Sequence, residues 1–73
     1  MPPETELEMA ERHVREGEIH VARQNELVEQ LRTDGHCTRQ AEELLAEFEA
    51  ILTEHKAHLD LIRAERNSSS GPH

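Results

Sequence analysis

The segment Thr33-Asp34-Gly35-His36-Cys37-Thr38 lies close to the midpoint of a chain of 73 residues. On each side of it runs a stretch of about thirty residues with a continuous helical pattern. Gly35 takes positive φ without strain, so it predicts a left-handed residue that ends a first helix. Cys37 or Thr38 can supply the side-chain cap that begins a second helix. Because so short a link makes two helices antiparallel neighbours, the sequence predicts an all-α fold, a helical hairpin.

The predicted hairpin is a single domain of residues 5–66, with helices at about 5–33 and 38–66 and a turn at 34–37. Residues 1–4 include two prolines and are expected to form a flexible N-terminus. The polar tail 67–73 is rich in Ser, Gly and Pro, so we expect it to be disordered.

The composition indicates that one hairpin is not stable alone. Only 34% of the residues are hydrophobic, with one Phe and no Trp or Tyr. A scaffold of this size usually needs a disulfide, a metal ion or oligomerisation to offset the entropy of its chain. The single cysteine cannot form an internal disulfide, so self-association or docking on another protein is the expectation.

The charge of the chain excludes several classes of partner. A net charge of −8 argues against nucleic acid and anionic membranes, because both attract clustered Lys and Arg. No apolar run approaches the ~20 residues needed to span a bilayer. The N-terminus lacks the basic start and apolar core of a signal peptide. Together with a free cysteine, these features are typical of a cytoplasmic protein.

The apolar residues of the first helix form one narrow heptad seam, which Gly17 and Gln24 weaken. The second helix is broader and has two apolar edges. We assign the edge through Leu44, Phe48 and Ile51 to the first helix. The other edge would then lie against a second hairpin, in a homodimeric four-helix bundle. The interface residues predicted for this dimer are Leu45, Phe48, Leu52 and Leu59.

Folding the chain about its turn predicts a register in which the numbers of facing residues add to about 71 or 72. This register places Gly17 opposite His55 and Val21 opposite Ile51. One interpretation is that the glycine makes room for the imidazole ring. The other is a tolerated weak position, because glycine costs a helix ~1 kcal/mol relative to alanine.

Four histidines lie on or beside the inner faces of the two helices. Imidazole is the commonest protein ligand for zinc, and helical bundles hold metals between facing helices. The candidate ligands are His13, Glu16, His55 and His58, and zinc or another divalent metal is the only cofactor that the sequence suggests. His20 lies too far along the helix to join them. The alternative is a set of polar boundary residues that hydrogen-bond to Glu and Gln neighbours.

No feature of the sequence indicates an enzyme. The chain has no nucleophile paired with a base and no glycine-rich phosphate loop. Cys37 lies near the start of the second helix, where the helix dipole favours the thiolate. It is either a reactive or subunit-joining thiol, or simply a small residue in a turn.

Three segments resemble a group of short proteobacterial proteins that are generally described as hypothetical. These proteins pair a GE-x-H-[IV]-A-R-Q segment with a DGH-x-T turn and an LL-x-x-F segment. The matching segments here are Gly17-Glu18-Ile19-His20-Val21-Ala22-Arg23-Gln24, Asp34-Gly35-His36-Cys37-Thr38 and Leu44-Leu45-Ala46-Glu47-Phe48-Glu49. The resemblance covers roughly residues 11–62.

The resemblance implies the helical hairpin and brings no activity with it. It marks His20, Arg23, Gln24 and His36 as positions that matter, without assigning them a role. Cys37 departs from the pattern, because the similar sequences usually have Asp there.

The function that we expect from the sequence is a small acidic interaction module that pairs with itself and presents a helix face to a regulatory protein. The alternative is a histidine-based protein that binds or senses metal ions. Such a protein could also sense pH, because imidazole changes charge between about pH 5 and 8.

Overall fold

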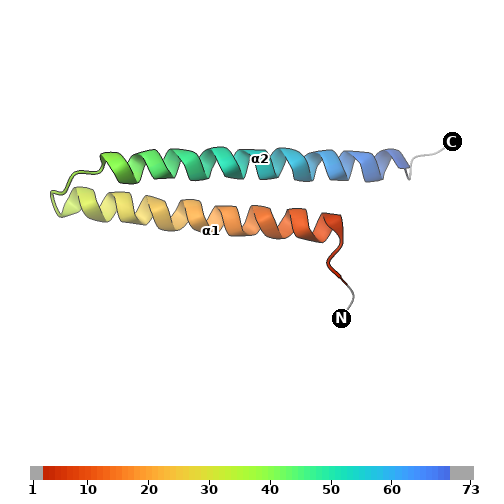
Figure 1. The fold of residues 1–73 in the computed structure, drawn as a ribbon, viewed down its shortest axis with the longest axis horizontal. Helices are drawn as coiled ribbons and strands as arrows, with labels where there is room; N and C mark the ends of the chain where they lie inside the picture. The colour runs from red at the N-terminus through yellow and green to blue at the C-terminus, as the bar shows by residue number, and fades with distance from the viewer. Residues whose placement is uncertain (1–2, 70–73) are drawn as a thin grey trace.

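The computed structural model describes residues 3–69, which form two antiparallel helices with no strand (Figure 1). Helix α1 spans Glu6–Thr33 and helix α2 spans Arg39–Ser69. The predicted all-helical hairpin is confirmed. Helix α2 continues to Ser69 and past the start of α1, so residues 67–69 belong to the helix rather than to the predicted tail. The remaining parts of the predicted flexible ends, 1–2 and 70–73, lie outside the described residues.

A capping box begins α1. The Thr5 hydroxyl accepts a hydrogen bond from the Glu8 backbone N–H, and the Glu8 carboxylate accepts one from the Thr5 N–H, both at 3.1 Å. This exchange satisfies two backbone donors that the first turn would otherwise leave without partners. The preceding residue, Glu4, folds back onto α1, where its carboxylate lies 3.0 Å from Arg12.

The turn is a Schellman motif, built on Gly35 with φ of +77°. The Gly35 N–H donates to the Arg32 carbonyl at 3.2 Å, and the His36 N–H donates to the Leu31 carbonyl at 2.9 Å. These two bonds satisfy carbonyl groups that the end of α1 leaves open. The Thr38 carbonyl then accepts the Glu42 N–H at 2.8 Å, which begins the hydrogen bonding of α2.

We call the pair of inner faces along which the helices pack the seam. Its residues on α2 differ from those that the sequence analysis assigned to it. Within residues 39–67 of α2, the buried or half-buried residues follow alternating steps of four and three: Ala41, Leu45, Phe48, Leu52, His55, Leu59 and Ile62. Leu45, Leu52 and Leu59, which were predicted to face a second hairpin, therefore face α1. Phe48, which the sequence placed on both edges, also lies in the seam. Leu44 and Ile51, assigned to the seam from the sequence, are instead 40% and 47% exposed.

Small residues of α1 explain this orientation of α2. Gly17 packs against Leu52 so closely that a Cβ on the glycine would lie 3.0 Å from the leucine Cδ1. One heptad earlier, Ala10 clusters with Leu59 and Ile62. The numbers of facing residues add to 69, as for Gly17 and Leu52, rather than to 71 or 72. The glycine thus makes room for a leucine, and the expectation that it faces His55 is wrong.

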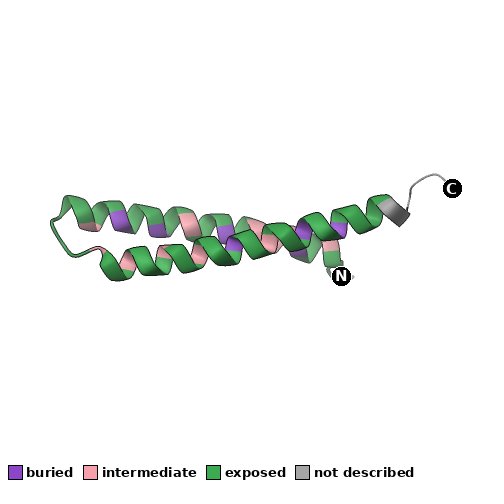
Figure 2. Cartoon of the chain, turned by 90° about the horizontal axis from the view of Figure 1, so that it is seen from above, coloured by how far each residue is buried: buried purple, intermediate pink, exposed green. Residues whose placement is uncertain are grey.

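The hairpin is a single layer of helices. Its extents are 61 × 29 × 14 Å, and its radius of gyration is 17.1 Å. A compact domain of this length would have a radius of gyration of about 11 Å. Figure 2 shows the buried residues in a line where the helices face each other, with exposed residues on all other sides. Most of each helix is therefore open to solvent.

We predict that Gly17→Val lowers the free energy of unfolding by roughly 1–3 kcal/mol, because the added methyl groups overlap Leu52. The matched control is Ala22→Val, at an exposed position of the same helix, which changes only helix propensity. Urea denaturation measures both. Equal effects of the two variants would contradict the close approach of α1 and α2 at Gly17.

The capping box predicts a pH dependence. The hydrogen bond from the Thr5 backbone N–H lowers the pKa of Glu8 below its ordinary value of 4.5. The stabilisation is therefore complete above pH 4.5 and is lost as the pH falls below this value, through the lowered pKa. Glu8→Gln keeps the box without the titration. We expect the protection of the Met9 amide from hydrogen exchange, relative to the intrinsic rate at each pH, to fall more in acid for the wild type than for Glu8→Gln. An equal loss of protection would show that the box does not titrate.

Candidate interaction surface

The two sides of the seam differ in chemistry. On one side, Arg63 lies 3.5 Å from Glu11 and Arg32 lies 3.0 Å from Glu42, so ion pairs link α1 to α2 near both ends of the hairpin. We call this side the charged flank. These side chains are exposed, and such pairs typically contribute about 0–1 kcal/mol. They favour the observed register more than they stabilise the fold.

The opposite side is apolar and histidine-rich. Its residues recur every seven positions on each helix and are His13, His20, Leu27, Leu44, Ile51 and His58. We call this row the apolar flank. Its large aliphatic side chains are well exposed, at 44% for Leu27, 40% for Leu44 and 47% for Ile51. One heptad before His13, the Glu6 carboxylate lies 4.0 Å from His58 Nε2, which shows that the two rows lie on the same side.

Two histidines of α1 cover the edge of the seam. The His13 ring lies 5.0 Å from the His55 ring, tilted by 42°. The His20 ring lies 5.6 Å from the Phe48 ring, tilted by 36°. Each imidazole thus packs over a seam residue of α2, so these histidines are boundary residues between the core and solvent.

Of the predicted metal ligands, the structure brings only His13 and His55 side by side. Glu16 is engaged by Arg12, 2.9 Å away, whose hydrogen bond lowers the pKa of that carboxyl group. His58 lies beside Glu6 instead. Within residues 3–69, no group of three or more His, Cys, Asp and Glu side chains could hold a metal ion.

Gln24 has a structural role that its position in the seam did not reveal. It is 8% exposed, and its side-chain amide donates a hydrogen bond to the Ala41 carbonyl at 2.9 Å. A buried amide without a partner would be costly, so this bond makes the polar residue compatible with the seam. Among the positions that the resemblance marks, Arg23 and His36 are exposed.

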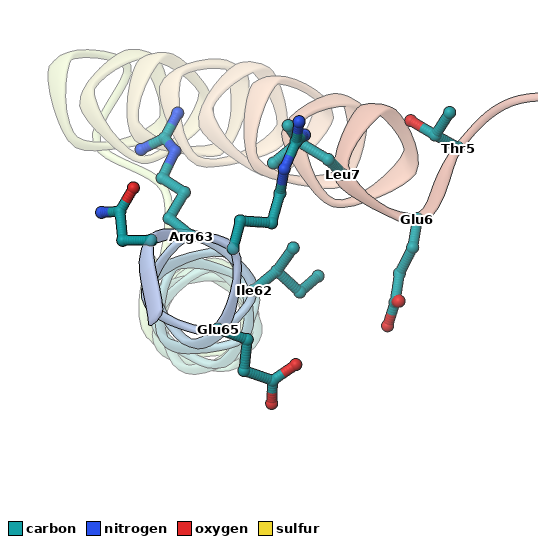
Figure 3. Close-up of a pocket in the computed structure, with 8 residues that line it drawn as sticks. Thr5, Glu6, Leu7, Ile62, Arg63 and Glu65 are labelled. Carbon is teal, nitrogen blue, oxygen red and sulfur yellow. The ribbon is translucent and has the colours of Figure 1, made fainter. Parts of the chain in front are cut away.

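The hairpin is hollowed at its open end, between the start of α1 and the end of α2. The hollow is lined by apolar and charged residues: Thr5, Glu6, Leu7, Ile62, Arg63, Glu65, Arg66 and Asn67. Leu7 packs against the seam cluster that contains Ile62. In Figure 3, Glu6 and Glu65 project to one side of the seam, whereas Arg63 extends from α2 toward α1. The hollow is the open end of the seam rather than an enclosed site.

The turn presents Cys37 to solvent as a free thiol.

Neither described helix is long and apolar enough to cross a membrane. No family model, curated protein or solved structure matches the chain. The apolar flank is therefore the feature of the described residues on which a functional argument can be built.

The Gln24 bond predicts a loss of stability for Gln24→Ala of about 1–2 kcal/mol, because a hydrogen bond and packed volume both disappear. Asn25→Ala, at an exposed position of α1, serves as the control and should leave the unfolding midpoint nearly unchanged. Thermal denaturation followed by circular dichroism compares them. A Gln24→Ala variant as stable as the control would show that the amide contributes nothing to the seam.

Proposed function

We propose that the protein is a non-enzymatic interaction module that binds a second copy of itself through the apolar flank and so forms a four-helix bundle. The observation that supports this proposal is the exposure of Leu27, Leu44 and Ile51 in one row across both helices. Such a row is expected where another helical layer packs.

The heptad pattern supports a bundle over an isolated hairpin. A two-helix seam needs only two apolar positions per heptad, and here those positions face the partner helix of the same chain. At a third heptad position, the apolar flank adds Leu44 and Ile51 to α2 and Leu27 to α1. Helices with apolar residues at three positions of seven are typical of globular bundles, in which each helix has two neighbours.

The free energy of burying the apolar flank indicates whether that flank alone could hold a dimer together. Burial of a large aliphatic side chain is worth ~1.5–3 kcal/mol, so a side chain that is already half buried gains roughly 1 kcal/mol. Three such residues from each copy give about 6 kcal/mol, against an association cost of ~4–15 kcal/mol. Contacts beyond the apolar flank must therefore contribute to the dimer.

A histidine-based metal protein is the competing proposal. It has support from the neighbouring rings of His13 and His55, 5.0 Å apart between centroids. Structural zinc sites have four protein ligands, so the further ligands would have to come from elsewhere. A different regulatory protein could also cover the apolar flank in place of a second copy.

We predict that Ile51→Glu weakens self-association at least tenfold, because it places a carboxylate in the dimer interface. Ile19→Glu is a matched control: Ile19 is 48% exposed against 47% for Ile51, but it lies on the outer face of α1, away from the apolar flank. Sedimentation equilibrium at micromolar concentration compares both variants with the wild type. A wild type that is fully helical with one chain's mass would refute the proposed self-association, as would equal effects of the two substitutions.

A further inference from the structure

We propose that the second copy binds with its turn at the same end of the bundle, so that α1 of each copy lies along α2 of the other. This inference rests on the proposed dimer and concerns its orientation. A two-fold axis can relate two such hairpins in two ways, because the same flank must be used by both copies. An axis parallel to the helices places the turns together, and an axis across them places the turns at opposite ends.

The register of the hairpin gives the height of each residue along it. A residue of α1 lies at the same height as the α2 residue for which the two residue numbers add to 69, as they do for Gly17 and Leu52. Leu27 is therefore level with position 42, close to Leu44, and His20 is level with position 49, close to Ile51. With the turns together, Leu27 of one copy meets Leu44 of the other. With the turns at opposite ends and Ile51 placed on Ile51 of the other copy, Leu44 meets His58 instead.

A second row supports the same orientation. It borders the apolar flank on its outer side and contains Met9, Glu16, Arg23 and Gln30 of α1, with Gln40, Glu47, Glu54 and Leu61 of α2. Met9 is level with position 60, so turns at the same end bring it to Leu61 of the other copy. These two side chains are 36% and 57% exposed in the single hairpin, so their contact would bury apolar surface.

Charge complementarity within this row also distinguishes the two orientations. Arg23 is level with position 46, so turns at the same end bring it to Glu47 of the other copy, and Gln30 reaches Gln40. Like charges then approach at Glu16 and Glu54, although Arg12 already pairs with Glu16 at 2.9 Å.

Turns at opposite ends are less favourable. That orientation lays α2 on α2, so that Glu47 of each copy meets Glu54 of the other, with no described arginine beside either one. It also places Leu61 against Gln40. Turns at the same end thus bring Leu27 to Leu44 and Met9 to Leu61, and they add two Arg–Glu pairs per dimer, which are the additional contacts that the apolar flank alone lacks.

The native cysteine measures the orientation directly. Cys37 is exposed in the turn and is the only cysteine of the chain. Nitroxide labels on Cys37 of the full-length protein should lie within about 25 Å of each other when the turns are together, since neighbouring helices are ~8–10 Å apart. Turns at opposite ends would separate them by about 45 Å, at 1.5 Å of rise per residue. Pulsed electron resonance distinguishes these distances.

A charge exchange provides an independent test. Arg23→Glu and Glu47→Arg should each weaken dimerisation about tenfold, and the double variant should restore the wild-type dissociation constant. Arg15→Glu, on the side of α1 away from the apolar flank, is the control and should leave dimerisation unchanged. A dimer with the long label distance, or a double variant without restoration, overturns the proposed orientation while leaving the dimer itself. A monomeric wild type overturns the proposed function and this inference together.

Discussion

The packing of Leu52 against Gly17 determines the rest of the structure. Its geometry, with only 3.0 Å available for a Cβ on the glycine, fixes how closely the helices approach and how α2 is rotated about its axis. With Leu52 turned inward, Leu59 one heptad later meets Ala10 in the same way. The same rotation turns Leu44 and Ile51 outward into the apolar flank. The seam and the candidate interaction surface are thus two results of one contact.

The hairpin could be predicted from the sequence because Gly35 and the helical patterns around it leave few alternatives. The rotation of α2 could not, because its apolar residues form two overlapping heptad rows. One row runs through Leu44 and Ile51 and the other through Leu45 and Leu52, and both have steps of three and four. The two small residues of α1 distinguish these rows, since they need large partners. In the sequence alone, the same signal is compatible with space for a histidine or with a tolerated weak position of the helix.

The histidines show how the second helix changes which candidate metal ligands lie together. His55 and His58 are three residues apart and share a broad face of α2. In the hairpin this face is divided: His55 lies in the seam against His13, whereas His58 lies on the apolar flank beside Glu6. The sequence spacing makes Glu16 a candidate fourth ligand. In the structure, the guanidinium group of Arg12 lies 2.9 Å from its carboxylate and would compete with a metal ion for it. Whether a residue is available for binding therefore depends on the second helix.

The unequal chemistry of the two flanks limits how large an assembly can become. A layer of helices with a binding surface on both sides would add further copies without limit, as open filaments do. Here the ion pairs Arg63–Glu11 and Arg32–Glu42 occupy one side, and the aliphatic residues occupy the other. In the proposed dimer, a symmetric contact would cover the apolar flank of both partners at once and leave the charged flank exposed. A hairpin that pairs with a second copy as we propose would therefore stop growing at two.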